Sequence, residues 1–214
     1  MTFVVVLVGW IFSLCLHEFS HAVVAYLGGD TTVREKGYLT FNPLKYTHPV
    51  YSLLLPLLFL VMGGIGLPGG AVYIETWRLR SKRWVSAVSL AGPLSNLVLA
   101  IVLAVVLRLA PVDSSGIWPG LAFLALLQVT AVVLNLIPVP PFDGFGAVEP
   151  HLKEEARMRL APIRGAMLWI VFLVLWYVPL VNKMFWDLIF FLSRLIGVPL
   201  TLASAGLNQF LFWR

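Results

Sequence analysis

The chain has 214 residues, of which 60% are hydrophobic and only 12% are charged, with a formal net charge of +5. A soluble domain is about half apolar and about a quarter charged, so this composition excludes an ordinary soluble protein and indicates an integral membrane protein. The positive charge does not indicate nucleic-acid binding, because the basic residues lie in short loops beside apolar runs, a pattern typical of helices oriented in a lipid bilayer.

The N-terminal run is expected to be a retained membrane helix rather than a secretory leader. Residues 1–16 lack a basic start, no convincing small-residue cleavage site follows, and the apolar run continues to Leu27. This run contains Cys15, the only cysteine of the chain, which excludes an intrachain disulfide and a cysteine-based zinc site.

Six apolar runs follow one another along the chain, and a membrane-spanning helix needs about 20 residues of this kind. They cover residues 3–27, 50–74, 84–109, 119–138, 164–181 and 184–212. The second run contains two prolines and five glycines, so we expect it to break part-way as a helix. Such backbone is tolerated at membrane depth where it is buried in protein or lines a cavity.

The charges of the loops predict the topology. Loops 28–49 and 75–83 are both basic, and basic loops lie on the cytoplasmic side. Residues 50–74 are therefore predicted to enter and return as a re-entrant hairpin, with the N-terminus and the loop 111–120, which has no basic residue, outside. The fold class that follows is all-α and integral to the membrane, a polytopic helical bundle of about five to six spans.

The stretch LCLHEFSHAVVAYLGGD places three ionisable residues inside the first apolar run, where such groups are retained only with partners. His17 and His21 stand at positions i and i+4 and share one face of a helix, so both imidazoles can bind one metal ion. Glu18 is close enough to act on a water held by that metal, as general base and then as general acid. A hydrogen-bonded cluster without metal is the alternative.

A third ligand is expected from elsewhere, because a catalytic zinc site has three protein ligands and one open position. Asp143 is the candidate, in the stretch NLIPVPPFDGFG, where three prolines prevent regular helix and Gly144 permits a tight turn. The predicted hairpin topology brings Asp143 and His21 to the same side of the membrane, whereas a full crossing by residues 50–74 would separate them. The alternative is a turn aspartate that caps the next segment.

Three motifs in this order resemble those of the site-2 proteases, the intramembrane zinc metalloproteases: HEFSH at 17–21, AGPLSN at 91–96 and NLIPVPPFDG at 135–144. The likeness covers residues 10–145 and points to the compact prokaryotic subgroup, which carries a segment like GGDTTVREKGYLTFNPLKYTHPV after the first motif. A PDZ-like or CBS-like domain is not expected, since no loop is long enough to hold one. The family's more frequent leucine before the aspartate is a phenylalanine here, while the aspartate and the following glycine are kept.

The resemblance implies one zinc ion, held by His17, His21 and Asp143, with Glu18 as the catalytic acid and base. It also places Asn96 and Asn135 near the active site, where they bind substrate backbone or orient the site. A polar amide in an apolar helix can equally bond a neighbouring helix, so that reading stays open.

The composition and the apolar runs predict a single transmembrane domain over residues 1–214, which by the resemblance is a metalloprotease domain. Its core with the zinc motifs is 1–145, and residues 146–214 are expected to form a cytoplasmic loop and C-terminal helices. The resemblance also implies a small membrane-associated β-hairpin over residues 31–42, which would offer an edge to an extended substrate.

By the same resemblance, the expected function is hydrolysis of peptide bonds in or near transmembrane segments of membrane proteins, in a prokaryotic cell membrane with the active site toward the cytoplasm. The expected partners are a membrane-protein substrate and the lipid bilayer, without nucleic acid. The alternative is a zinc transporter that uses His17, His21 and Asp143 as a transit site. Such a protein has little need for Glu18, so Glu18 separates the two hypotheses.

Overall fold

The computed structural model describes residues 1–46, 72–110, 113 and 115–213. Within these ranges the secondary structure consists of helices and turns without a strand, which confirms the predicted all-α fold. The long helices are α1 (Thr2–Gly28), α4 (Lys82–Leu109), α5 (Trp118–Asn135), α8 (Arg164–Tyr177), α9 (Pro179–Ile196) and α10 (Leu200–Phe210). Shorter helices are α2 (Thr32–Glu35), α6 (Asp143–Val148) and α7 (Glu154–Leu160), with 3₁₀ turns at Pro43–Lys45, Thr76–Arg78, Glu149–His151 and Ala161–Ile163.

Among the described residues, four helices are long and apolar enough to cross a membrane: α1, α4, α5 and the stretch Glu154–Tyr177, which comprises α7 and α8. A fifth is reached if α9 and α10 are one span, although they are bent by 119° at the break between them. The apolar run over residues 184–212 is thus divided between two helices rather than forming one straight helix, for a local reason. Gly197 ends α9 in the left-handed conformation (φ +89°), and Pro199 then stands at the N-cap of α10.

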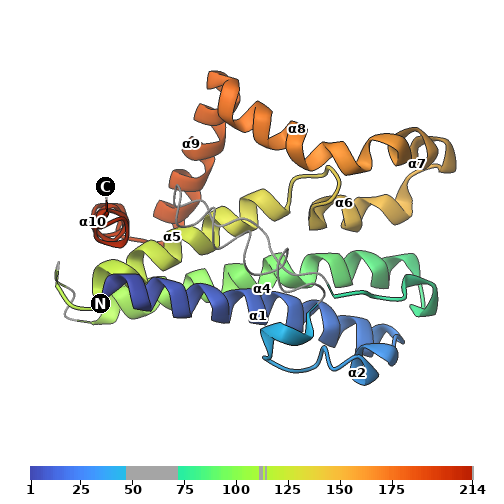
Figure 1. Ribbon diagram of the computed structural model, residues 1–214, viewed down its shortest axis with the longest axis horizontal. Coiled ribbons are helices and arrows are strands. Elements are labelled where there is room, and N and C mark those ends of the chain that lie inside the picture. Colours follow the sequence, from blue (N-terminus) through green and yellow to red (C-terminus); the bar gives the residue numbers. More distant parts are fainter. Residues whose placement is uncertain (47–71, 111–112, 114, 214) are drawn as a thin grey trace.

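Helices α1, α4 and α5 form the centre of the bundle, and α10 packs against the beginning of α5 (Figure 1). Glycines at the helix interfaces allow the neighbouring helices to approach each other closely. A Cβ added to Gly9 would lie 2.3 Å from Leu124 Cδ2, and one added to Gly206 would lie 2.0 Å from the Pro119 carbonyl oxygen. Close packing at small residues is the usual source of stability between membrane helices. The apolar core here comprises Val6, Trp10, Leu14, Phe123, Leu124, Leu127 and Phe210.

Helices α1 and α5 run in the same direction, and α4 runs back beside them (Figure 1). The amide of Arg80 donates to the carbonyl of Gly28 over 3.0 Å, so the chain leaves the end of α1 and returns to it before α4 begins. This return agrees with the predicted topology. The predicted re-entrant hairpin over residues 50–74 lies, apart from its last three residues, outside the described residues.

The β-hairpin expected over residues 31–42 is wrong. This segment forms the short helix α2 and a turn, because local bonds use the backbone groups that a strand would need. The Asp30 carboxylate accepts from the amide and the hydroxyl of Thr32, and the Tyr38 amide donates to the Val33 carbonyl. Gly37 takes the positive φ (+75°) that completes the turn.

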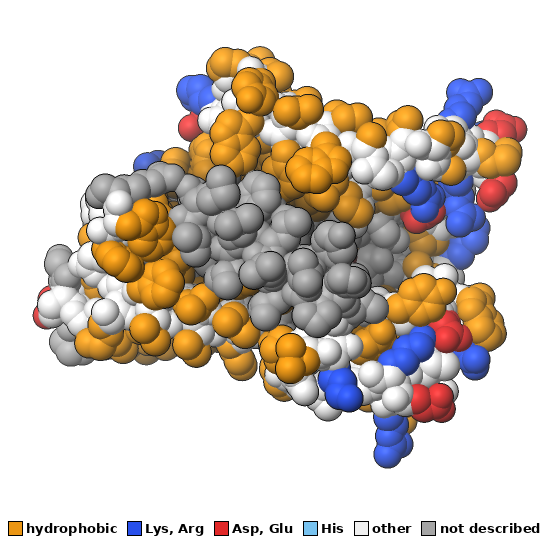
Figure 2. Space-filling view, in the orientation of Figure 1, with side chains coloured by type: hydrophobic (Ala, Val, Ile, Leu, Met, Phe, Trp, Pro, Cys, Tyr) orange, Lys and Arg blue, Asp and Glu red, His pale blue; other side chains and the backbone are white. Residues whose placement is uncertain are grey.

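Charged side chains gather mainly at the end of the molecule that carries α2 and α7, and elsewhere on the face seen in Figure 2 the described side chains are mostly hydrophobic. That distribution suits a bundle with an apolar belt in lipid and a charged end in water.

Candidate metal centre

Two histidines project from the buried face of α1, one helical turn apart. Their Nε2 atoms lie 3.0 Å from each other, and His17 and His21 are only 7% and 6% exposed. Each ring is held at its other nitrogen. The Nδ1 atom of His17 lies 3.1 Å from Oδ1 of Asn96, and that of His21 lies 2.6 Å from the carbonyl of Val88. Both partners are acceptors, so each Nδ1 carries the proton and each Nε2 presents a lone pair.

Asp143 reaches the same point from the first residue of α6. Its Oδ2 lies 3.1 Å from Nε2 of His17 and 3.5 Å from Nε2 of His21. The turn that delivers it depends on Gly144, where an added Cβ would lie 2.3 Å from the Leu136 carbonyl oxygen. Helix α6 is fastened to α4 by the Ser86 hydroxyl, which donates to the Ala147 carbonyl over 2.7 Å.

The three side chains fit a metal ion. Their ligand atoms all lie within 4.8 Å of one another, and the three separations of 3.0, 3.1 and 3.5 Å match the edge of about 3.3 Å in a zinc tetrahedron. Within the described residues, the buried Oδ2 of Asp143 accepts no hydrogen bond, as expected if the neighbouring Nε2 atoms carry no proton. Two lone pairs and a carboxylate oxygen that converge in this way repel each other unless a cation lies between them.

Glu18 lies beside this triad and is 3% exposed. Its Oε2 accepts a hydrogen bond of 3.1 Å from the amide of Val72, so a segment remote in sequence fixes the direction of the carboxylate. The arrangement is that of a metal site with a carboxylate able to move a proton next to it.

The two predicted asparagines differ in their placement. Asn96 is 5% exposed and contacts His17, so it belongs to the immediate surroundings of the triad. Asn135 is 4% exposed and is the last residue of α5, eight positions before Asp143. It is close to the site in sequence, and its role stays a prediction.

Gly92 is the site residue that the sequence reasoning missed. A Cβ at this position would lie 2.4 Å from Nε2 of His21 and 2.5 Å from Nε2 of His17, so only glycine allows α4 to pass this close. The signal was present in the motif AGPLSN, as a glycine in the interior of a long apolar helix. The Val88 carbonyl and the Val72 amide were missed as well, because backbone groups carry no signal in the residue types.

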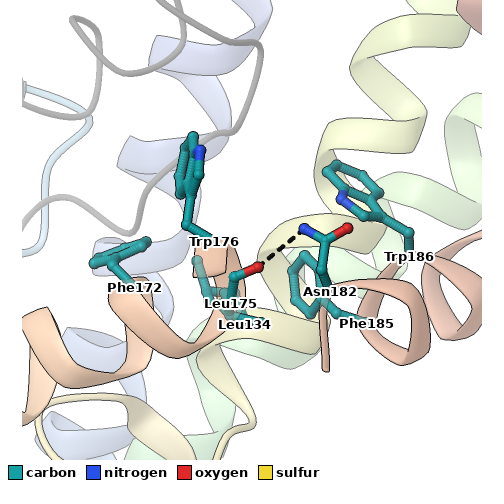
Figure 3. A pocket seen from close by; sticks show the side chains of 7 residues that line it. All are labelled: Leu134, Phe172, Leu175, Trp176, Asn182, Phe185 and Trp186. Atoms are coloured by element: carbon teal, nitrogen blue, oxygen red, sulfur yellow. Dashed lines mark hydrogen bonds between the residues drawn. The ribbon is translucent and has the colours of Figure 1, made fainter. Parts of the chain in front are cut away.

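A separate cavity of about 210 Å³ lies between α5, α8 and α9 and includes none of the three predicted ligands. Its lining is mostly aromatic and aliphatic: Leu134, Phe172, Leu175, Trp176, Asn182, Phe185 and Trp186 (Figure 3). The Asn182 side chain donates to the Leu175 carbonyl over 2.9 Å and so joins the start of α9 to α8.

Relatives of the chain are found among curated proteins. "Putative zinc metalloprotease Rip2" of Mycolicibacterium smegmatis is 48% identical over 214 residues, covering 99% of this chain and 81% of the relative. The protein of the same name from Mycobacterium tuberculosis is 48% identical over 213 residues, with the same coverage. "Putative zinc metalloprotease YwhC" of Bacillus subtilis is 30% identical over 191 residues, covering 84% of this chain and 83% of the relative. No family model matches, and no solved structure is significantly similar.

Proposed function

The chain belongs to the family of the Rip2 zinc metalloproteases, and we propose that it is a site-2-type endopeptidase that hydrolyses peptide bonds in or near membrane-spanning segments. The observation that supports this most is the convergence of His17, His21 and Asp143, buried within a bundle of apolar helices, with Glu18 beside them. Under the proposal, these three residues hold one zinc ion.

A bound zinc ion would supply Lewis acidity toward the scissile carbonyl and toward water. The chain's own residues supply the proton transfers and the geometry. Glu18 takes a proton from the attacking water while the oxygen of that water bonds to the carbonyl carbon of the substrate. It then gives that proton to the leaving nitrogen as the carbon–nitrogen bond breaks. Asn96 and the Val88 carbonyl keep both imidazoles in the tautomer that presents Nε2.

The substrate we propose is a membrane protein with a transmembrane helix. His17 and His21 lie in a helix whose apolar character suits lipid, so a substrate in the same bilayer reaches their depth without leaving it. Its helix must unwind locally, because helical carbonyls are engaged in intrahelical hydrogen bonds. We propose that the site faces the cytoplasm of a prokaryotic cell membrane. The described residues between α1 and α4, at the end of α1 near the histidines, are rich in lysine and arginine, and such loops lie on the cytoplasmic side.

The substitution Glu18→Gln tests the mechanism. It keeps size and polarity but removes the group that accepts the proton, so cleavage of a transmembrane substrate is expected to fall by about 100-fold or more. Zinc content of the purified protein, measured by mass spectrometry, is expected to stay near one ion per chain. Glu35→Gln is the matched control, because Glu35 is an exposed carboxylate on α2.

Comparative membrane proteomics of cells that carry either form would identify the substrate, which accumulates at full length with the Glu18→Gln protein. Cleavage that survives this substitution would contradict the proposed chemistry. Zinc uptake into vesicles by the purified protein would instead support the transporter alternative, which the names of the relatives do not favour.

A further inference from the structure

Asp30 is a buried carboxylate outside the metal centre, just beyond the end of α1. It is 0% exposed, and within the described residues no lysine or arginine forms an ion pair with it. Its hydrogen-bond donors in the described part of the chain are neutral: Oδ1 accepts from the amide and hydroxyl of Thr32, at 3.1 and 2.6 Å, and Oδ2 accepts from the amide of Glu75 at 2.8 Å. A buried charge without a cation is costly, so these hydrogen bonds are what keeps it in place.

The Glu75 amide belongs to a segment that also contacts Glu18. Residues Val72–Glu75, which we call the strap, are not helical and run between two carboxylates. At one end the Val72 amide donates to Glu18 Oε2 over 3.1 Å, and at the other end the Glu75 amide donates to Asp30 Oδ2.

A third fastening lies between the two ends of the strap. The Lys36 ammonium donates to the Tyr73 carbonyl over 3.3 Å and to the Glu75 carboxylate over 2.9 Å. Lys36 is partly exposed, and a contact of this kind in water contributes little. The bond to Asp30 is 2.8 Å long and ends on a carboxylate that is itself 0% exposed, so it is the firmer of the two attachments at this end of the strap.

The two oxygens of Asp30 serve different elements. Oδ1 alone accounts for both contacts with Thr32 and hence for the beginning of α2, whereas Oδ2 is directed at the strap. A residue needed only to cap α2 would not require the second oxygen.

We propose that Asp30 is a positioning residue for Glu18 and acts through the strap, an inference that rests on the proposed peptidase function. Asp30 fixes the Glu75 amide, the strap carries that constraint to Val72, and the Val72 amide fixes one oxygen of Glu18. The other oxygen is then directed at the proton to be moved. Displacements of about 1 Å in such a group are enough to reduce turnover strongly.

The sharpest test removes a single donor from the backbone. Glu75→Pro deletes the amide hydrogen that binds Asp30, and the φ of −85° at this position is close to that of proline. Glu75→Ala is the matched comparator, because it loses the same side chain but keeps the amide. Relative to Glu75→Ala, Glu75→Pro is expected to lower kcat on the order of tenfold or more, with KM within about twofold and zinc content unchanged.

Hydrogen exchange of the full-length protein in detergent gives a second readout that does not depend on activity. The amides of the strap are expected to exchange faster in Glu75→Pro than in Glu75→Ala, while the peptides of α1 and α4 keep their protection. Asp30→Asn changes the acceptor of the same hydrogen bond: the amide has one acceptor oxygen, whereas the carboxylate uses two. This variant should have the same effects, and it replaces Glu75→Pro in the test if the proline variant does not fold.

The proposal is overturned if exchange in the strap accelerates while kcat stays within about twofold of the comparator, or if the loss appears in KM or in zinc content instead. It is equally overturned if neither variant changes exchange in the strap. Failure of the proposed function looks different: the unaltered protein would then cleave no transmembrane substrate, or Glu18→Gln would cleave as well as the unaltered protein, whatever the strap variants do.

Discussion

At the scale of single residues, Gly92 determines how closely α4 approaches the two imidazoles. An added methyl group would lie about 2.5 Å or less from both Nε2 atoms, where the metal ligands converge. Gly92→Ala is therefore expected to lower zinc occupancy and to reduce cleavage by about 100-fold or more, as measured by metal analysis and peptide cleavage.

Gly165→Ala is the matched control for this prediction. Gly165 also stands in a helix, α8, but nothing lies within 4 Å of an added Cβ there, so zinc content and cleavage should stay unchanged. A Gly92→Ala protein that keeps its zinc and its activity would contradict the placement of α4 against the histidines.

Asn96 gives a second prediction at this scale. Asn96→Ala removes the oxygen that holds Nδ1 of His17, and loss of such an outer partner costs about 10- to 100-fold in metal affinity. Competition with a zinc chelator of known affinity measures the change. Asn182→Ala is the control, since that amide bonds a carbonyl in the cavity between α8 and α9. Equal zinc affinity in the two variants would exclude an orienting role for Asn96.

The sequence was most informative where chemistry and spacing coincide. His17 and His21 were predictable because their spacing places them on one helical face, and Asp143 because carboxylates near membrane depth are scarce in this chain. The structure brings these three side chains together. Gly92 and the Val72 amide were not predictable, because their contacts join α1 to segments more than 50 positions away and depend on the helices' final distances.

At the scale of elements, the turn between the strap and α4 is fastened by ion pairs that depend on pH. Hydrogen bonds from Arg78, and then from Lys36, lower the pKa of Glu75 from its ordinary value of 4.5 to about 2. The folded protein thus favours the carboxylate, so this contribution to stability is present above pH 4.5 and is lost as the pH falls toward 2.

The expected observation concerns Glu75→Gln in detergent. Its thermal midpoint should lie slightly below that of the unaltered protein at pH 6, because partly exposed ion pairs contribute little each, and the difference should shrink as the pH is lowered from about 4.5 toward 2.5. Taking the difference between the two proteins removes the pH dependence that comes from the carboxylates present in both. A difference that stays constant over this range would show that the ion pairs of Glu75 do not stabilise the fold.

Element boundaries were predicted less well than element types. The helical class was correct because long apolar runs in lipid satisfy their backbone internally. The expected strands over residues 31–42 failed because the Asp30 carboxylate and Gly37 favour local turns over strand pairing. The bend between α9 and α10 was overlooked because the hydropathy of the run continues across Gly197.

At the scale of the whole molecule, the two ends of α4 are predicted to face opposite sides of the membrane. Lys82, the first residue of α4, and Ser115, beyond its other end, are both exposed, and about 40 Å of helix lies between them. The only natural cysteine, Cys15, is 3% exposed and should not react with a thiol reagent. Labelling of a cysteine introduced at either position therefore shows on which side of the membrane that position lies.

With a membrane-impermeant maleimide on intact cells, Ser115→Cys is expected to label and Lys82→Cys to label only after permeabilisation. Positive loops stay on the cytoplasmic side, which fixes this order. The reverse pattern would place the metal centre near the outer face and contradict the proposed orientation, while leaving the ligand geometry untouched.

The hydrogen bond between the Arg80 amide and the Gly28 carbonyl has a consequence for the order in which the metal centre can come apart. It joins the end of α1 to the residues that lead into α4, so these two helices are held together at their charged end as well as at the metal centre. Helix α1 carries both imidazoles, and α4 carries the Val88 carbonyl and Asn96 that hold them. The imidazole ligands and their partners therefore belong to one rigid pair of helices, and the imidazoles lose their orientation only when the two helices separate.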